Sequence, residues 1–171
     1  MFHVLSQTGT LLHEDHVNTL AALENLEELL RKKSPKKVPE GSDPDLRAVL
    51  TEIRGVTCRE VGRHFGFEEE HLFPVLTQAG QIGMVMLLKG EHEAILPVAN
   101  ALNTLANTLL EAWEVTPEQW QEFHALGSEM VERESFHIQK EEMGLLAAIN
   151  ALIDPDTDSR LAEIFRNLPE A

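Results

Sequence analysis

The sequence predicts an all-α protein, an up-down-up-down four-helix bundle with a short C-terminal helix. Apolar residues recur at three- and four-residue spacing along almost the whole chain, which is typical of amphipathic helices. No stretch alternates apolar and polar residues as a half-buried strand would. Breaker residues divide the chain into four segments of roughly 25 to 35 residues, and long helices with short connections pack naturally as a bundle.

A proline-rich connection separates the first two predicted helices. The first covers 8–33 and stops before SPKKVPEGSDP, a polar stretch with three prolines. The second begins with Ser42 or Asp43 as N-cap and Pro44 in its first turn, and runs to about residue 78. The apolar stripe of the first helix consists of Leu11, Leu12, Leu20, Leu23, Leu26, Leu29 and Leu30.

The second half of the chain holds two long helices and a short one. QAGQIG, at 78–83, separates the second helix from a third that continues to about residue 113. Thr116 caps the fourth helix, with Pro117 at its first position and an end near residue 153. A short helix over 157–167 follows DPDTD. With 171 residues, we expect 1–171 to form one domain with a sizeable core.

Composition excludes several classes of partner. Acidic residues outnumber basic ones by 29 to 14, which argues against a nucleic-acid surface because phosphates require clustered positive charge. Residues 71–88 lack Asp, Glu, Lys and Arg but contain too many glycine, proline and glutamine residues for a membrane span. The single Cys58 gives no internal disulfide, and the opening residues do not resemble a signal peptide, so we expect a cytoplasmic protein.

Two His-x-x-x-Glu pairs carry the most specific signal. His64 and Glu68 lie four residues apart, so a helix places both side chains on one face, one turn apart. Phe65, Leu72, Val75 and Leu76 flank that stripe and predict that the pair faces the interior. His137 and Glu141 repeat the pattern in the fourth helix.

The first and third helices each add one inward histidine, His16 and His92, in register with their leucines. Buried ionised carboxylates beside four histidines are costly unless cations lie between them. Four imidazoles and two carboxylates suit two transition metals, most plausibly iron, each bound by two histidines and bridged by Glu68 and Glu141. A lone histidine on an apolar stripe is more often a core residue, and we expect solvated helix faces for Glu69, Glu70, Glu91, Glu93 and Glu142.

The residues around these pairs resemble the hemerythrin family in its broad HHE cation-binding form. HFGFEEEHLFPVL is similar to that family's second helix, in which a ligand histidine is followed by a ligand glutamate and then Leu-Phe-Pro. EDHVNTLAALENLEELL, EHEAILPV and HIQKEEMGLL resemble its first, third and fourth helices. The resemblance implies as iron ligands His16, His64, His92 and His137, with Glu68 and Glu141 as bridges.

One ligand position departs from the oxygen-carrying hemerythrins, which have a second histidine in the third helix where this chain has Leu96. Four imidazoles, two bidentate carboxylates and one oxo or hydroxo bridge supply about ten of the about twelve bonds that two six-coordinate irons need. Roughly one position per iron is then open. The expected function is a non-haem di-iron protein that binds or senses O2, NO or peroxide, or handles iron, rather than an enzyme acting on an organic substrate.

The sequence holds further histidines and leaves two alternative assignments open. His13 and His71 are candidate extra ligands, although a hydrogen-bond partner or a surface residue is favoured for both, and His124 is expected at the surface. Glu68–His71 and Glu134–His137 match the Glu-x-x-His pairs of ferritin-like di-iron ferroxidases and oxidases. The other alternative is a metal-free helical module that dimerises through ILPVANALNTLANTLL, a nearly uncharged stretch of the third helix.

Overall fold

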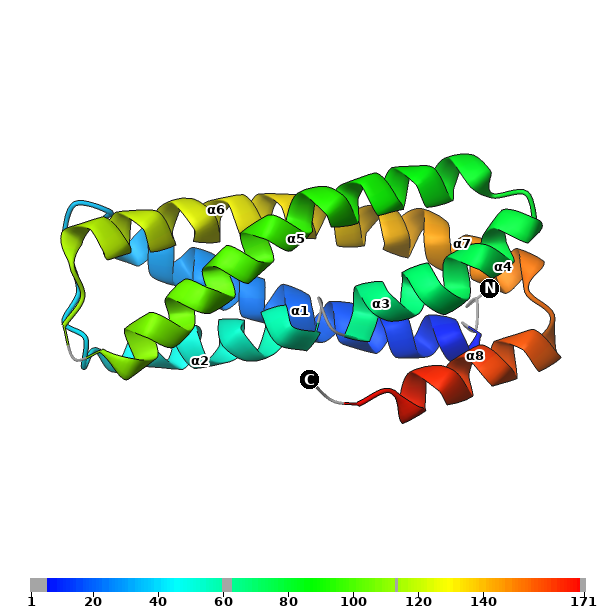
Figure 1. The fold of residues 1–171 in the computed structure, drawn as a ribbon, viewed down its shortest axis with the longest axis horizontal. Coiled ribbons are helices and arrows are strands. Elements are labelled where there is room, and N and C mark those ends of the chain that lie inside the picture. The colour runs from blue at the N-terminus through cyan, green and yellow to red at the C-terminus, as the bar shows by residue number, and fades with distance from the viewer. Residues whose placement is uncertain (1–5, 60–62, 113, 170–171) are drawn as a thin grey trace.

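The computed structural model describes residues 6–59, 63–112 and 114–169. Every regular element in these ranges is helical, which confirms the predicted all-α class (Figure 1). None of the helices in this part of the chain is both long enough and apolar enough to span a membrane. The elements in order are α1 (Gln7–Lys32), α2 (Pro44–Arg59), α3 (Phe65–Phe67), η2 (Glu68–Leu72), α4 (Phe73–Gln78), α5 (Ile82–Glu111), α6 (Pro117–Lys140), η3 (Glu141–Leu145), α7 (Leu146–Leu152) and α8 (Pro155–Asn167).

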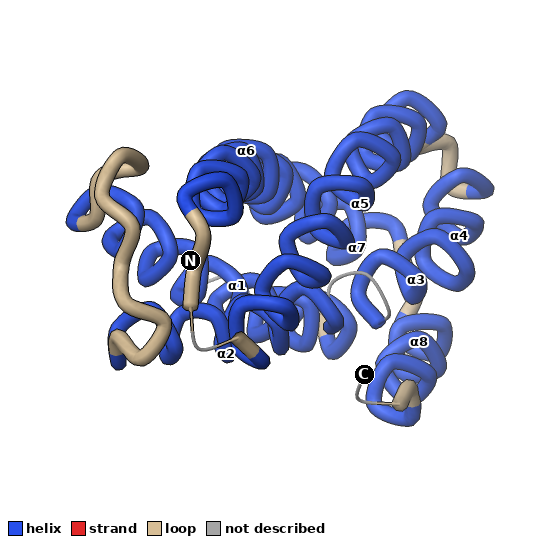
Figure 2. The backbone as a smooth tube through the Cα atoms, turned by 60° about the vertical axis from the view of Figure 1, so that its left-hand side comes forward, coloured by secondary structure: helices blue, strands red, loops and turns tan. Residues whose placement is uncertain are grey.

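The long helices surround a shared interior. Helix α1 packs against α2 and α6, and α5 packs against the same two helices, so the four form a closed ring of contacts (Figures 1 and 2). At the other end α4 contacts α5 and α7, while α8 lies along α1. This is the arrangement of neighbours that a bundle requires.

The interior consists of two apolar clusters. One lies towards the α1–α2 connection and includes Leu26, Leu50 and Trp120. The other lies towards α8 and includes Phe73 and Phe165. The stretch ILPVANALNTLANTLL, which we considered as a dimer face, contributes to the first cluster. Its members there are Ile95, Val98, Ala99, Leu102, Leu105, Ala106 and Leu109.

Side-chain caps explain where several helices begin. Ser6 Oγ accepts a hydrogen bond from Gly9 N at 2.9 Å and starts α1. Asp43, rather than Ser42, caps α2, because its Oδ1 accepts from the backbone N–H of Leu46 at 3.1 Å. Thr116 and Gln119 form a reciprocal capping box at the start of α6, which confirms the predicted cap.

The second predicted helix is described in two parts. Helix α2 ends at Arg59, residues 60–62 are outside the described part, and the chain then continues through α3, η2 and α4. Helix α5, the third predicted helix, ends at Glu111. Residue 113, where this helix was expected to end, lies outside the described residues.

Two wide π-helical turns begin at the two inward glutamates. In η2 the N–H of Phe73 donates to Glu68 O, and in η3 the N–H of Leu146 donates to Glu141 O, each spanning five residues. Pro74, which has no N–H to donate, is the second residue after the first wide turn. The periodicity analysis assumes 3.6 residues per turn everywhere and therefore could not reveal either turn.

Helix α8 is fastened to the start of α1 by one side chain. The carboxylate of Asp158 accepts from the backbone N–H of Gln7 at 2.8 Å and of Thr8 at 3.0 Å. Burial raises the pKa of Asp158, but the hydrogen bonds from Thr8 and Gln7 outweigh it and hold the pKa below its usual value. Asp158 thus satisfies two N–H groups that the first turn of a helix leaves without partners.

We expect Asp158→Ala to lower the free energy of unfolding by about 1 to 3 kcal/mol, because it removes a capping acceptor and leaves N–H groups of α1 unpaired. Urea denaturation followed by circular dichroism measures the loss. Asp156→Ala is the matched control, since Asp156 lies exposed on the same helix. Equal losses in the two variants would show that the contact between Asp158 and α1 adds nothing to the free energy of unfolding.

Candidate metal centre

Six titratable side chains meet between the two apolar clusters. All six point inward, as the helical spacing predicts, and each is at most 1% exposed. Helix α1 supplies one, the segment from residue 64 to η2 supplies two, α5 supplies one, and α6 with η3 supplies two. The six are His16, His64, Glu68, His92, His137 and Glu141.

The four imidazoles form two pairs. Nε2 of His16 lies 3.3 Å from Nε2 of His64, and Nε2 of His92 lies 3.2 Å from Nε2 of His137. Their Nε2 atoms therefore converge on two neighbouring points in the bundle interior.

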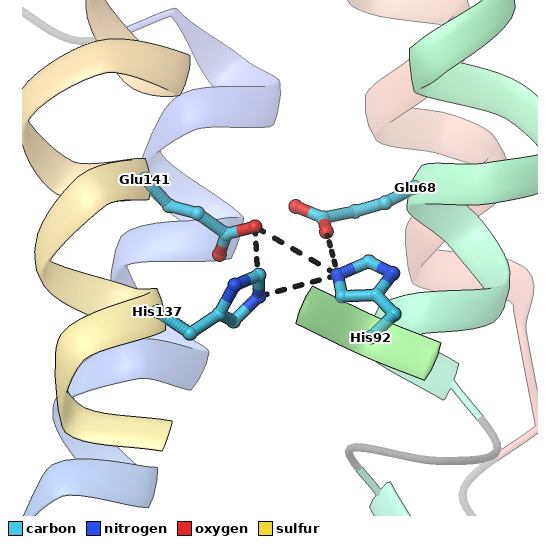
Figure 3. Close-up of side chains that lie close together, drawn as sticks. All are labelled: Glu68, His92, His137 and Glu141. Atoms are coloured by element: carbon cyan, nitrogen blue, oxygen red, sulfur yellow. Dashed lines mark hydrogen bonds and ion pairs between the residues drawn. The ribbon is translucent and has the colours of Figure 1, made fainter. Parts of the chain in front are cut away.

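Each buried carboxylate reaches both pairs. Glu141 places Oε2 at 3.0 Å from Nε2 of His16 and Oε1 at 3.1 Å from Nε2 of His137. Glu68 places Oε1 at 3.6 Å from Nε2 of His64 and Oε2 at 3.3 Å from Nε2 of His92. Figure 3 shows Glu68 and Glu141 pointing toward each other, with His92 and His137 below them in this view. One oxygen per pair is the arrangement that a carboxylate bridging two cations needs.

A second carboxylate lies behind each imidazole, at Nδ1. A nitrogen that donates its hydrogen to a carboxylate leaves the opposite nitrogen with a free lone pair, here directed inward. The approach to His64 is the longest. The distances from Nδ1 are 2.6 Å from His16 to Glu142, 3.5 Å from His64 to Asp15, 2.9 Å from His92 to Glu69 and 3.0 Å from His137 to Glu91.

The sequence analysis was wrong about three of these carboxylates. Glu69, Glu91 and Glu142 were expected on solvated helix faces but are half-buried against imidazoles of other helices. Glu70 and Glu93 are exposed, as expected. Each of the three directly adjoins an inward histidine or glutamate in the sequence, but exposed Glu93 also adjoins His92, so adjacency alone could not have identified them.

The donor set fits cations on physical grounds. Within the described ranges, no group donates a well-formed hydrogen bond to an oxygen of Glu68 or Glu141, although both carboxylates are fully buried. Neutral imidazoles with Nδ1–H turned outward would direct paired Nε2 lone pairs at each other, so a positive charge is needed between them. Among the described residues, candidate ligand atoms within 4.8 Å of one another form two groups, Glu68–His92–His137–Glu141 and His16–His64–Glu141. Histidine nitrogen with carboxylate oxygen suits iron and similar transition metals.

Protons supply that charge when no metal does. Burial lowers the pKa of His137, but Glu141, Glu134 and Glu91 outweigh it and raise the pKa to about 10. Burial likewise lowers the pKa of His16, yet Glu141 and Glu142 leave it above its usual value. Burial raises the pKa of Glu141, but the surrounding histidines, His137 first, bring it well below its usual value.

Glu134 is a third fully buried carboxylate, which the metal-ligand prediction did not include. It lies three residues before His137 in α6, and its negative charge helps to raise the pKa of that histidine. The Glu-x-x-His spacing of the ferritin-like alternative was the signal that marked it.

The three other histidines in the described ranges lie outside the group of six. His13 is partly exposed and shares Glu142 with His16, at 3.0 Å from its Nδ1. The side chain of His71 is 34% exposed, with Glu70 as its ion-pair partner. His124 is half-buried rather than fully at the surface, with Nε2 3.0 Å from Leu30 O. Leu96 is half-buried against the first apolar cluster.

Comparison with known proteins agrees with the residues and the geometry. Residues 9–149 match the model of one family, described as the hemerythrin HHE cation binding domain. No curated protein matches the chain significantly. The match covers most of the 171 residues and includes all six buried side chains of the centre. The chain therefore belongs to the hemerythrin HHE cation-binding domain family.

Proposed function

We propose that this protein is a non-haem di-iron protein that binds or senses a small ligand such as O2, NO or peroxide. The observation that carries the proposal is the placement of Glu68 and Glu141, each with one oxygen towards each histidine pair. In this assignment His16 and His64 would hold one iron, and His92 and His137 would hold the other. The fold is that of an up-down-up-down bundle whose four long segments each contribute ligands.

Bound iron would supply reversible one-electron chemistry and coordination positions for a small molecule. The protein orients the imidazoles through their Nδ1 carboxylates and keeps the interior dry with two apolar clusters. With an oxo or hydroxo bridge, the ligands fill about ten of about twelve positions. Half-buried Leu96, where the oxygen carriers have a histidine, adds no ligand.

The surroundings support a small ligand. A cavity of about 460 Å³ lies between α5 and α6, but none of the six buried side chains lines it. Its wall includes Glu91 and Lys140, which lie behind His137. An organic substrate in this cavity would remain separated from the centre, whereas a diatomic molecule or peroxide needs little space.

The ferritin-like alternative receives less support. It needs the Glu68–His71 pair to face inward, and the His71 side chain is 34% exposed. It also needs glutamates from the first and third helices, where Glu14 and Glu93 are exposed and Glu91 contacts the outer nitrogen of His137. Buried Glu134 is the one observation in its favour. Handling of iron remains compatible with the same centre.

Metal content tests the proposal directly. Protein purified without chelator should hold about two irons per chain, with oxo-bridge absorption that bleaches on reduction with dithionite. His64→Ala and His137→Ala should each reduce the content to about one iron or fewer, because each removes half of a histidine pair. His71→Ala is the matched control and should keep both irons. Loss of iron in His71→Ala would favour the ferritin-like set, and absence of metal after anaerobic ferrous reconstitution would exclude both.

Metal affinity should fall steadily as pH falls from about 9 to 6. The raised pKa of His137, about 10 without metal, means that a metal must displace a proton across this whole range. Competition with a chelator whose own protonation is known, repeated at each pH, measures the dependence. Affinity that is flat over this range would contradict a histidine-dominated site.

Without metal, the stability of the protein should fall as pH rises above about 6.5, whereas metal affinity should rise with pH. The raised pKa of His137 contributes stability fully present below 6.5 and lost as pH rises towards 10, whereas the lowered pKa of Glu141 contributes stability present above 4.5. We expect the highest melting temperature between about pH 4.5 and 6.5. Thermal unfolding in chelator measures it, and His137→Gln should flatten the alkaline decline. A decline equally steep in His137→Gln would assign it to other groups.

A further inference from the structure

The carboxylates behind the His92–His137 pair are each joined to a lysine. Oε2 of Glu91 lies 3.0 Å from Nδ1 of His137, and its Oε1 lies 2.5 Å from Nζ of Lys140. Oε1 of Glu69 lies 2.9 Å from Nδ1 of His92, and its Oε2 lies 3.8 Å from Nζ of Lys89. Both carboxylates on this half of the centre therefore share their charge with a fixed cation.

The carboxylates behind the His16–His64 pair have no such cation. Glu142 approaches His16 at 2.6 Å and His13 at 3.0 Å, and Asp15 lies 3.5 Å from His64. Within the described ranges, neither Glu142 nor Asp15 forms an ion pair with a lysine or an arginine. The two halves have matching inward ligands but different charges behind them.

This difference acts on the metals through the imidazoles. A carboxylate that accepts Nδ1–H makes its imidazole a stronger electron donor at Nε2. A lysine on the same carboxylate draws that electron density away and adds positive charge near the metal. The His16–His64 half should thus stabilise a ferric ion better, and the His92–His137 half a ferrous ion.

We propose that the two metal positions are inequivalent and that Lys89 and Lys140 direct the first electron to the iron held by His92 and His137. In this step a one-electron donor is oxidised and one ferric ion becomes ferrous, with no bond made or broken in the protein. The inference rests on the proposed di-iron function. It makes both lysines positioning residues, since they act through Glu69 and Glu91 without touching the metal.

The effect should be modest, because the side chains of Lys89 and Lys140 are 46% and 44% exposed. Exposed ion pairs correspond to changes of about two- to five-fold in an equilibrium constant. Here that constant describes the stability of the half-reduced centre, with one ferric and one ferrous ion, relative to the two symmetric states.

A potentiometric titration followed by electron paramagnetic resonance measures this constant. The combined variant Lys89→Gln with Lys140→Gln should make the first reduction harder and lower the constant about two- to five-fold. Lys140→Arg, combined with native Lys89, should keep the wild-type value because the charge is retained. Lys32→Gln is the matched control, since Lys32 also forms an exposed ion pair, with Glu28 at 2.7 Å, but belongs to no group of the centre.

A variant on the other half tests which position is which. Asp15→Asn removes the negative charge 3.5 Å from Nδ1 of His64, so it should make the second reduction easier and leave the first unchanged. If the lysine variants shift the second step instead, or if Asp15→Asn shifts the first, the assignment of the first electron is wrong. If Lys89→Gln with Lys140→Gln behaves like Lys32→Gln while both irons are present, the lysines have no such role.

The wild-type protein offers a test that needs no substitution. Raising the ionic strength from about 0.01 M to about 1 M shortens the Debye length from about 30 Å to about 3 Å and screens the two exposed lysines. The constant should fall with salt in the wild type and change less in the double variant. An identical salt response in both would overturn the inference. Iron content is measured first. A protein without iron would contradict the proposed di-iron function, whereas a protein with two irons but no effect of the lysines would contradict only this inference.

Discussion

Everything in this protein is arranged around the burial of four imidazoles and two carboxylates in one layer. The layer lies between two apolar clusters, where unpaired charge would be prohibitively costly. It is tolerable only when protons or metal cations balance the carboxylates, so folding and metal binding are parts of one equilibrium. The caps, the wide turns and the contact between α8 and α1 serve to hold the contributing segments in a single register.

The outer carboxylates link those segments in a cycle. Each adjoins a buried ligand in its own segment and lies beside Nδ1 of a histidine of another segment. Asp15 of α1 faces His64, Glu69 of η2 faces His92 of α5, Glu91 of α5 faces His137 of α6, and Glu142 of η3 faces His16 of α1. Displacing one segment would therefore misorient a ligand on the next, which ties the accuracy of the centre to the packing of the whole bundle.

Sequence reasoning found what depends on one helix at a time. The inward direction of His64 and Glu68 follows from their spacing and from apolar neighbours, and the same holds for His137 and Glu141. It missed the contacts between side chains of different helices. Helical periodicity shows which face of its own helix a residue occupies, but not which side chain of another helix lies opposite. Glu69 was assigned to solvent for that reason. The wide turns follow from local backbone geometry that apolar spacing does not encode.

The wide turns at Glu68 and Glu141 also bear on how such a chain tolerates change in length. A π turn contains about one residue more than an α turn, and one residue corresponds to about 100° of helix rotation. Removing a residue just after Glu68 would leave His64 and Glu68 in place but rotate the whole of α4, turning Phe73 and Leu76 away from their cluster. The extra residue thus rotates the helix that follows it. Because of this rotation, Glu68 faces the buried imidazoles while Phe73 and Leu76 face the apolar cluster.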